Sequence, residues 1–383
     1  MSSGSIQIGM IMSTAFPPRE GIGFYVWNLA QQLRRRGHEV QIITRGCARA
    51  SYREIADGIT VWRAAYAPTF PWHVHLHGLF VDRLVKRLET QVDVFHLHSP
   101  LVRMPRTHRP TLLTIHSLMQ AASASFKLDS LFSVLTKLQT PVSRTLEHEA
   151  LQRADYISCV SQASANELLA AGIKSDKIGV FANGVDASIF YPAPGPPLPG
   201  RYALAVGRLS PGKGLEDLLV SVEFVIRHYP QLRCLIAGEG PLRSKLKAEI
   251  DRRGLGANIT LVGQISDRTE LAALYRGAAL YIHPSHYEGL PTALLEAMAC
   301  GCPSIATDVG SVSSVLHNNL NGLLVEPRQP TQLAAAMLRM LDRPELADRL
   351  GHQAASTVAA QYTWSTLGQK YLDCYQALVS GAA

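Results

Sequence analysis

The sequence predicts an α/β protein with two doubly wound domains, and three observations support this prediction. Short apolar runs alternate with longer amphipathic stretches in the first half of the 383-residue chain, and the same alternation starts again in the second half. Strands that alternate with helices form parallel sheets with right-handed crossovers. Between the halves, residues 191–200 hold five prolines, which cannot continue a helix or a central strand. The expected domains are residues 1–192 and 193–361.

The elements follow from the apolar runs in order. In the first half we expect strands at 6–12, 40–44, 93–97, 112–115 and 156–160, and helices at 22–36 and 118–152, the second interrupted at Pro141. In the second half we expect strands at 202–206, 234–237, 259–262, 280–283, 304–306 and 322–325. An amphipathic stretch at 364–378 predicts a last helix, within residues 362–380, after the second sheet is complete.

Composition and charge narrow the class of protein. No apolar run reaches the roughly 18 residues of a membrane span. The amino terminus lacks the basic region of a signal peptide, and the six cysteines form no Cys-x-x-Cys pair. These features predict a cytoplasmic chain with free thiols. Residues 1–192 hold 20 Lys and Arg against 14 Asp and Glu, whereas residues 193–383 hold 17 against 16.

The basic excess of the first half has two readings. It gathers at residues 34–36, 83–87 and 103–109. Such a field attracts anionic surfaces, so a phosphorylated acceptor, a lipid-linked acceptor or peripheral contact with the inner membrane face is one expectation. A solvated face that aids solubility is the other. Charge alone does not predict a nucleic-acid partner.

The stretch from His283 to Ala306 contains the largest group of candidate binding residues. Glu288 lies in the turn after an apolar run, Pro291 stands where a helix begins, and Glu296 lies inside that helix. The helix's first amides, near Leu290, Pro291 and Thr292, form an anion site. Backbone amides bind phosphate groups, and carboxylates accept hydrogen bonds from hydroxyl groups. A nucleotide sugar carries both.

A second motif supplies positive charge. Arg208 and Lys213 lie in the glycine-rich loop that starts at Gly207 and follows the first strand of the second half. A guanidinium fork and an ammonium together suit a diphosphate. No Asp-x-Asp occurs in the chain, so we expect these cations to replace a metal ion. Gly238 would let the backbone approach a nucleotide closely.

In the first half, Gly21 and Gly23 follow the first strand and open the first helix, so they would allow a phosphate to approach. The third position of a dinucleotide fingerprint is Val26, which disfavours that cofactor. His116 ends a strand and is a candidate for contact with a sugar or developing charge; for His96 and His98, packing or acceptor contact is favoured over catalysis. His73, His75 and His77 alternate like ligands on a strand face, but no nearby carboxylate or cysteine supports a metal site.

These motifs, in this order, resemble one family. Glu288-Gly-Leu-Pro…Glu296 looks like the Glu-x7-Glu signature of retaining glycosyltransferases of family 4, which have the GT-B fold of two Rossmann-like domains facing a cleft. Asn183-Gly-Val-Asp186 also matches, although locally it reads as a structural turn. Glu20, in the first glycine loop, and Ser311 and Ser314, in the loop after 304–306, depart from the family pattern.

The resemblance implies a retaining, metal-independent hexosyltransferase without a cofactor, acting on a nucleotide-sugar donor, most commonly UDP-linked, and a hydroxyl acceptor. Arg208 and Lys213 would hold the diphosphate, and Glu296 the ribose. Glu288, with the backbone of Gly289 and Leu290, would orient the sugar. His116 would lie near the sugar and Ile265 near the base. The last helix would pack back on the first domain, and closure would bring Gly21 and Gly23 onto the phosphates. The alternative is a non-catalytic nucleotide-sugar-binding relative.

Overall fold

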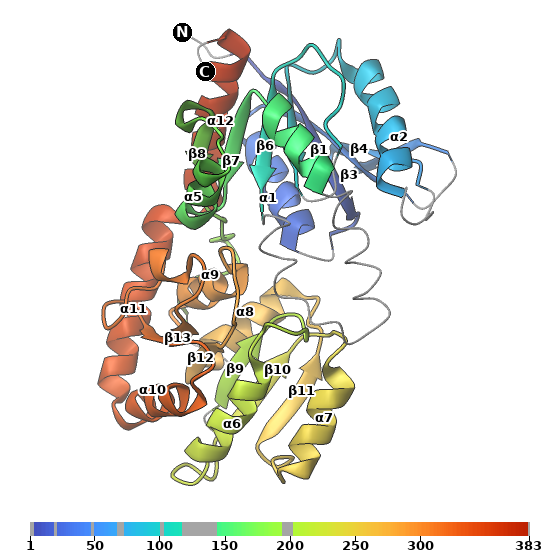
Figure 1. The fold of residues 1–383 in the computed structure, drawn as a ribbon. Helices are drawn as coiled ribbons and strands as arrows, with labels where there is room; N and C mark the ends of the chain where they lie inside the picture. Colours follow the sequence, from blue (N-terminus) through green and yellow to red (C-terminus); the bar gives the residue numbers. More distant parts are fainter. Residues whose placement is uncertain are drawn as a thin grey trace. The chain divides into compact units, whose positions relative to one another are not determined.

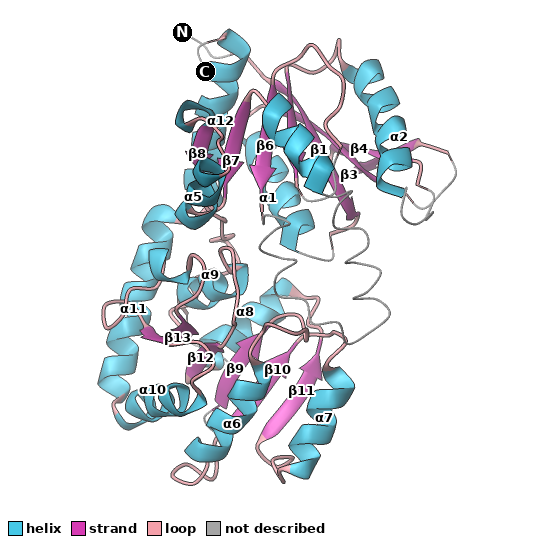
Figure 2. Ribbon diagram, viewed as in Figure 1, coloured by secondary structure: helices cyan, strands magenta, loops and turns pink. Residues whose placement is uncertain are grey.

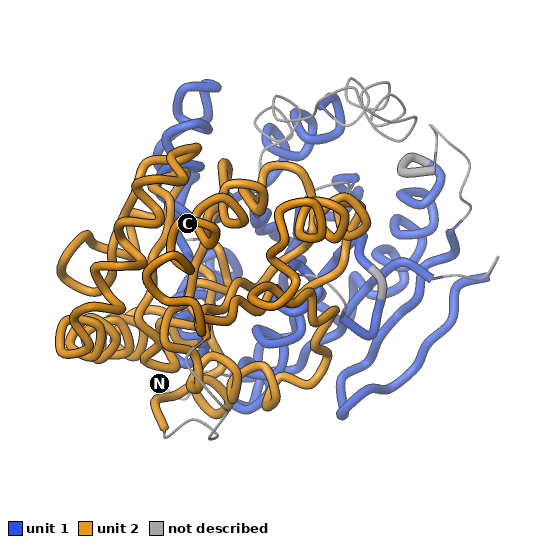
Figure 3. Tube along the Cα trace, turned by 90° about the horizontal axis from the view of Figure 1, so that it is seen from below, with its two compact units in different colours: residues 1–182, 364–383 blue, residues 183–363 orange. Residues whose placement is uncertain are grey.

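The computed structural model divides the chain into two compact units (Figures 1 and 3). It describes residues 4–18, 21–46, 50–66, 73–99, 103–116, 144–193 and 202–381. Unit 1 comprises residues 1–182 together with 364–383, and unit 2 comprises residues 183–363. The last helix is therefore part of unit 1, and the units divide between residues 182 and 183, ten residues before the predicted boundary between 192 and 193.

Unit 1 is built on an eight-stranded sheet with the order β3-β4-β2-β1-β5-β6-β7-β8. All neighbours are parallel except β3 and β4. Its strands are β1 (Gln7–Ala15), β2 (Glu39–Arg45), β3 (Tyr52–Ala56), β4 (Ile59–Ala64), β5 (Val94–His98), β6 (Thr111–Ile115), β7 (Tyr156–Cys159) and β8 (Ile178–Val180). The order reverses at β1, which pairs with β2 on one side and β5 on the other, so the doubly wound prediction is confirmed.

Among the residues of unit 1 that the structure describes, the helices are α1 (Gly21–Arg35), α2 (His73–Leu88), a helix at 144–153, α5 (Gln162–Ala170) and α12 (Trp364–Ser380). His73, His75 and His77, whose alternation resembles that of ligands on a strand face, form the first turns of α2 and not a strand. His77 is buried, and its Nδ1 lies 3.2 Å from the carbonyl oxygen of Ala65. The predicted break at Pro141 lies outside the described residues.

Helix α12 is tied to α1 and the sheet by buried tyrosines. The hydroxyls of Tyr25, on α1, and Tyr371 lie 2.5 Å apart. Tyr375 bonds to Nδ1 of His96, on β5, at 2.7 Å. At the start of α12, Arg36 donates a hydrogen bond to the carbonyl oxygen of Ser365 at 2.7 Å. The predicted amphipathic helix thus packs against α1 and β5, which lie far earlier in the chain.

Unit 2 contains a six-stranded, wholly parallel sheet with the order β11-β10-β9-β12-β13-β14. Its strands are β9 (Tyr202–Val206), β10 (Arg233–Ala237), β11 (Ile259–Gly263), β12 (Leu280–His283), β13 (Ser304–Thr307) and β14 (Leu323–Val325). Each lies where the apolar runs predict it. The order reverses between β9 and β12, and ligands of such sheets bind at the carboxyl ends of the strands near this point.

Two groups of helices flank this sheet (Figure 2). Helix α6 (Leu215–Val225) packs against α7 (Arg243–Arg252) and α10 (Pro330–Asp342), whereas α9 (Thr292–Ala299) packs against α8 (Arg268–Gly277) and α11 (Pro344–Gln361). The core between strands and helices is aliphatic. Within the described ranges, no helix of either unit has the length and apolarity needed to cross a bilayer.

Candidate functional site

The loop between β12 and α9 is the centre of the candidate site in unit 2. His283 is the last residue of β12, and Pro291 is the N-cap of α9 with an extended backbone. No side chain caps the first turn of α9, so its leading amides keep their capacity to bind an anion. The predicted strand, turn and proline-led helix are therefore all present.

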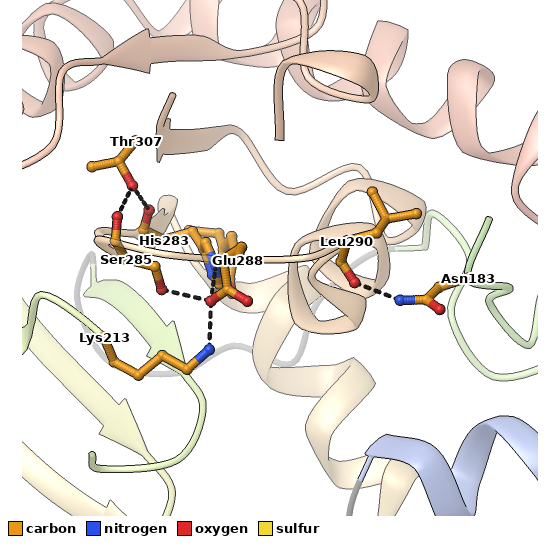
Figure 4. A network of polar contacts seen from close by, with 8 residues as sticks. Asn183, Lys213, His283, Ser285, Glu288, Leu290 and Thr307 are labelled. Atoms are coloured by element: carbon orange, nitrogen blue, oxygen red, sulfur yellow. Dashed lines mark hydrogen bonds and ion pairs between the residues drawn. The ribbon is translucent and has the colours of Figure 1, made fainter. Parts of the chain in front are cut away.

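Glu288 is the hub of a polar network in this loop (Figure 4). Its Oε1 atom accepts hydrogen bonds from Lys213 Nζ at 2.5 Å, Ser285 Oγ at 2.7 Å and His283 Nε2 at 2.9 Å. A carboxylate only accepts, so the Nε2 atom of His283 carries the hydrogen. The other ring nitrogen, Nδ1, lies 3.1 Å from the hydroxyl of Tyr281 and accepts from it when the ring is neutral.

The network keeps Glu288 ionised. Burial alone would raise the pKa of this carboxyl, whose side chain is only 10% exposed, but the charge of Lys213 and the bonds from His283 and Lys213 outweigh burial and hold the pKa well below its usual range. All three bonds go to Oε1. No described residue is bonded to Oε2, which leaves one oxygen of a fixed carboxylate able to accept from a ligand.

The glycine-rich loop after β9 is held against the loop after β12. Gly214 caps α6 in the left-handed conformation, with φ of +61°, and a Cβ there would lie 1.8 Å from the carbonyl oxygen of Pro284. The amide of His286 donates to the carbonyl of Gly212 at 2.7 Å. This backbone contact positions the side chain of Lys213 next to Glu288. Only glycine allows so close an approach at position 214.

Arg208 takes no part in the Glu288 network. It follows Gly207 at the end of β9, and its side chain is exposed with no hydrogen bond or ion pair to any residue that the structure describes. Gly238 directly follows β10, and its amide donates to the carbonyl of Gly263 at 2.7 Å. Ile265 follows β11 and is half-buried. These positions lie at the carboxyl edge of the sheet, as the sequence predicts.

Glu296 is placed differently from Glu288. It lies within α9, 7% exposed, and is bonded to Arg268 Nη2 at 2.8 Å through Oε1 and to Tyr275 OH at 3.4 Å through Oε2. Burial raises the pKa of this carboxyl, and Arg268 opposes the rise in part. Arg268 also lies over the ring of Phe190 at 4.7 Å. The sequence analysis missed Arg268. Its one local signal is Asp267, which caps α8 and so places Arg268 in the first turn.

The remaining predicted residues support the loop. Gly289 accepts from the amide of Ser311 at 3.2 Å, so the Ser311 backbone holds the Glu288 loop despite the departure from the family pattern. The carbonyl of the buried Leu290 accepts from Asn183 Nδ2 at 2.5 Å. Asn183 thus has a structural contact within unit 2, consistent with the turn reading of its motif. Thr292 is half-buried and opens α9.

In unit 1, a second set of predicted residues lies at the carboxyl edge of the sheet. Gly21 is exposed and opens α1, and Gly23 is buried in the first turn of that helix. Glu20 lies outside the described residues. His116 follows β6, its Nε2 lies 3.3 Å from Nδ1 of His98, and burial lowers its pKa to about 3. Both nitrogens of His96 are engaged, with Tyr375 and Thr114, which agrees with packing.

The described ranges hold no group of three His, Cys, Asp or Glu side chains placed to share a metal ion. The donors gathered in unit 2 are instead a lysine, an exposed arginine and the amides of α9, and the acceptors are two carboxylates. This set suits a ligand with both anionic and hydroxyl groups.

Comparison with known proteins covers both halves of the chain. The family model "Glycosyltransferase Family 4" matches residues 19–189, and "Glycosyl transferases group 1" matches residues 192–357. A glycogen synthase of Mycobacterium tuberculosis is 28% identical over 97% of this chain and 95% of its own length. A D-inositol 3-phosphate glycosyltransferase of Thermobispora bispora is 28% identical over 93% of this chain and 89% of its own.

Solved structures share the fold. Sucrose-phosphate synthase from Thermosynechococcus elongatus superposes with a TM-score of 0.83 at 23% identity, over 98% of this chain and all of that one. The Anabaena protein HepE, solved in complex with UDP and glucose, superposes with a TM-score of 0.74 at 18% identity, over 97% of this chain and all of its own.

Proposed function

The chain belongs to the family-4 glycosyltransferases of GT-B fold, and from this premise we propose that it is a retaining, metal-independent hexosyltransferase. The donor is a nucleotide-diphosphate sugar, most simply a UDP-linked glucose, N-acetylglucosamine or similar hexose, and the acceptor is a hydroxyl group. The observation that carries the proposal is the junction of Lys213, Glu288 and the uncapped start of α9 at the carboxyl edge of the unit 2 sheet.

The chemistry of the leaving group explains the cations. When the glycosidic bond breaks, negative charge grows on the diphosphate, and preorganised donors aimed at that charge stabilise the transition state. Lys213, the forked donors of Arg208 and the first amides of α9 supply this stabilisation without a metal ion. The leaving phosphate then assists attack by the acceptor from the same face of the sugar, so the reaction uses no protein nucleophile.

The two carboxylates bind different hydroxyl groups of the donor. Glu288 presents Oε2 to the sugar while Oε1 stays anchored to Lys213, Ser285 and His283. Glu296 accepts from the ribose, which then replaces or joins the bonds from Arg268 and Tyr275. Ile265 borders the base. The parts of Gly21, Gly23 and His116, all in unit 1, in donor binding stay predictions.

UDP is the nucleotide we propose, and the support is indirect. The fold neighbour HepE was solved in complex with UDP and glucose. For the acceptor, relatives named for D-inositol 3-phosphate and phosphatidyl-myo-inositol favour a phosphorylated or lipid-linked hydroxyl compound. The basic excess of the first half supports the same choice and also peripheral contact with an anionic membrane. Equal sedimentation with anionic and neutral vesicles would contradict that contact.

The test is thermal unfolding against UDP-, GDP-, ADP- and TDP-sugars with EDTA present. A ligand at about 100 times its Kd adds roughly 2.7 kcal/mol of stability. We expect a shift with one nucleotide family in the wild type, and its loss in Lys213→Ala. Lys245→Ala is the matched control, because Lys245 also forms an ion pair in unit 2, with Glu216 at 3.4 Å, but on the surface. An equal loss in both variants would contradict the site.

A donor-hydrolysis assay separates this proposal from its alternative. A non-catalytic nucleotide-sugar binder gives the same thermal shift but releases no free nucleotide from the donor, with or without acceptor. Slow release of UDP from a UDP-sugar in the presence of EDTA, abolished by Lys213→Ala, supports the enzyme. Release that appears only when Mg²⁺ is added would contradict the metal-free mechanism.

A further inference from the structure

The basic groups of unit 1 are not spread evenly over the sheet edges. In a parallel α/β unit each helix returns from the carboxyl edge of the sheet to the amino edge. The arginines at the end of α1 and the cations at the end of α2 therefore lie at the amino edge, away from the edge where ligands bind. Arg36 is also bonded to α12, through the carbonyl of Ser365.

The arginines near the carboxyl ends of the strands differ in their partners. Arg63, near the end of β4, forms an ion pair with Glu54 at 2.7 Å and donates to the carbonyl of Phe16 at 2.7 Å. Its charge is neutralised within the unit. Arg103, in the loop after β5, is likewise paired, with Asp82 at 3.7 Å. Neither cation is available to a ligand without losing a protein partner.

Arg45 is the exception. It is the last residue of β2, half-buried, and its Cα lies in register with Ala15 on one side and Ala64 on the other. Its guanidinium lies 4.7 Å from the ring centroid of Tyr66. Across the described part of the chain, no carboxylate pairs with it and no acceptor is bonded to its side chain. A partly buried cation without an anion is a costly arrangement that an anionic ligand relieves.

The surroundings of Arg45 fix its direction. The Tyr66 ring stands at 76° to the ring of His77, at 5.7 Å, and His77 is held by the carbonyl of Ala65. The guanidinium thus rests on a supported aromatic face, which keeps its planar fork in one orientation. Strand β2 neighbours β1, where the strand order reverses. The fork therefore stands one strand from the position at which α/β sheets bind ligands.

We propose that Arg45, seated on Tyr66, is a phosphate-binding group for the acceptor substrate in unit 1. This inference rests on the proposed function and gives the acceptor a chemical class: a hydroxyl compound that carries a phosphate ester. The planar fork binds two phosphate oxygens at once, which a surface lysine cannot do. The phosphate belongs either to a soluble sugar or polyol phosphate or to a phospholipid headgroup, and the chemistry at Arg45 is the same for both.

The experiment measures binding directly, so that it does not depend on turnover. Glycerol 3-phosphate and glucose 6-phosphate, each against glycerol and glucose, are titrated into the protein with UDP present, by calorimetry. Phosphatidylglycerol vesicles, against phosphatidylcholine vesicles, form the lipid arm. Variants are Arg45→Gln, Arg45→Lys and the control Arg53→Gln. Arg53 is an exposed arginine that also lies over an aromatic ring, 5.8 Å from Trp62, but it is on the edge strand β3.

We expect Arg45→Gln to weaken binding of a phosphorylated probe by 10- to 100-fold, the range for a charge-assisted hydrogen-bonded contact. Arg45→Lys restores part of the affinity, and Arg53→Gln binds like the wild type. Loss in the soluble arm alone assigns a soluble acceptor, and loss in the vesicle arm alone a lipid one. If no phosphorylated probe in either arm binds the wild type better than Arg45→Gln, or Arg53→Gln loses as much, the proposal is overturned.

Donor hydrolysis, measured on the same variants, distinguishes this failure from failure of the proposed function. Donor hydrolysis needs no acceptor, so the wild type and Arg53→Gln should release UDP from the donor whether or not Arg45 binds phosphate. Phosphate binding through Arg45 without any donor hydrolysis would contradict the proposed enzymatic activity and support the proposed phosphate site. Donor hydrolysis with no phosphate binding would do the reverse.

Discussion

Removal of Arg268 tests how the second carboxylate of the site is held. Arg268→Met keeps most of the side-chain stem but leaves Glu296, 7% exposed, with Tyr275 as its one remaining hydrogen-bond partner among the described residues. Loss of one member of a buried ion pair costs about 3–5 kcal/mol. The side chain of Arg268 is 25% exposed and the bond from Tyr275 remains, so we expect a loss of about 2–3 kcal/mol in the free energy of unfolding at pH 7.5.

The loss should depend on pH, with a sign that follows from linkage. Burial raises the pKa of folded Glu296 above its ordinary value of 4.5, so between the two values the folded protein binds a proton that the unfolded chain has released. Stability therefore falls as pH rises through this window. Without Arg268 the folded pKa rises further and the window widens. At pH 5 the loss should therefore be smaller than at pH 7.5.

Urea unfolding at pH 5 and pH 7.5 measures both quantities. Arg227→Met is the matched control, since Arg227 also lies over an aromatic ring, 5.1 Å from Phe224, but is exposed and near no buried carboxylate that the structure describes. It should change stability by less than about 0.5 kcal/mol at either pH. An equal loss for Arg268→Met at both pH values would refute the reasoning, because it would mean that packing and not the charge of Glu296 sets the cost.

Two further predictions concern the backbone and a histidine. Gly214→Ala should lower the free energy of unfolding by at least about 2 kcal/mol, because φ is +61° and the new Cβ would meet the Pro284 carbonyl. Gly256→Ala is the control, since Gly256 has open space around it, and it should not lower the free energy of unfolding in this way. Equal urea midpoints for the two variants would contradict this prediction. His116, with a pKa lowered to about 3, should show no imidazole titration by NMR between pH 5 and 8. As pH falls below about 6.5 the unfolded chain binds a proton at this histidine before the folded protein does, so the stability that the neutral His116 contributes is lost. A titration near pH 6.5 in the folded protein would contradict the burial argument.

The strands of unit 2 could be predicted because each contains a short, mainly apolar run, as expected for a wholly parallel sheet, although the edge strand β11 is only partly buried. The hairpin of β3 and β4 could not, because β3 lies at the sheet edge and alternates exposed and half-buried residues without an apolar run. Helix α2 was missed for a similar reason. Its histidines interrupt the apolar pattern at the start, and only the packed structure shows that His77 is turned inward.

The residue types of the site could be predicted from the sequence, but the partner of each carboxylate could not. Spacing places Glu288 in a loop and Glu296 on a helix, because both lie within one strand-turn-helix segment. The partner of each carboxylate comes from another segment: Lys213 is 75 residues from Glu288, and Arg268 is 28 residues from Glu296. Such pairs depend on which loops meet at one sheet edge, and no local pattern encodes that.

The asymmetry of the Glu288 carboxylate gives a last prediction. In Glu288→Gln, the amide oxygen must take the place of Oε1, since Lys213, Ser285 and His283 all donate there. The NH₂ group then replaces Oε2 and presents a donor where the sugar meets an acceptor. We expect the variant to bind UDP within about threefold of the wild type but to lose its preference for UDP-sugar over UDP. Calorimetry with both ligands measures this preference. If UDP and UDP-sugar weaken equally, Glu288 serves the phosphate through Lys213, and the proposed contact with the sugar is wrong.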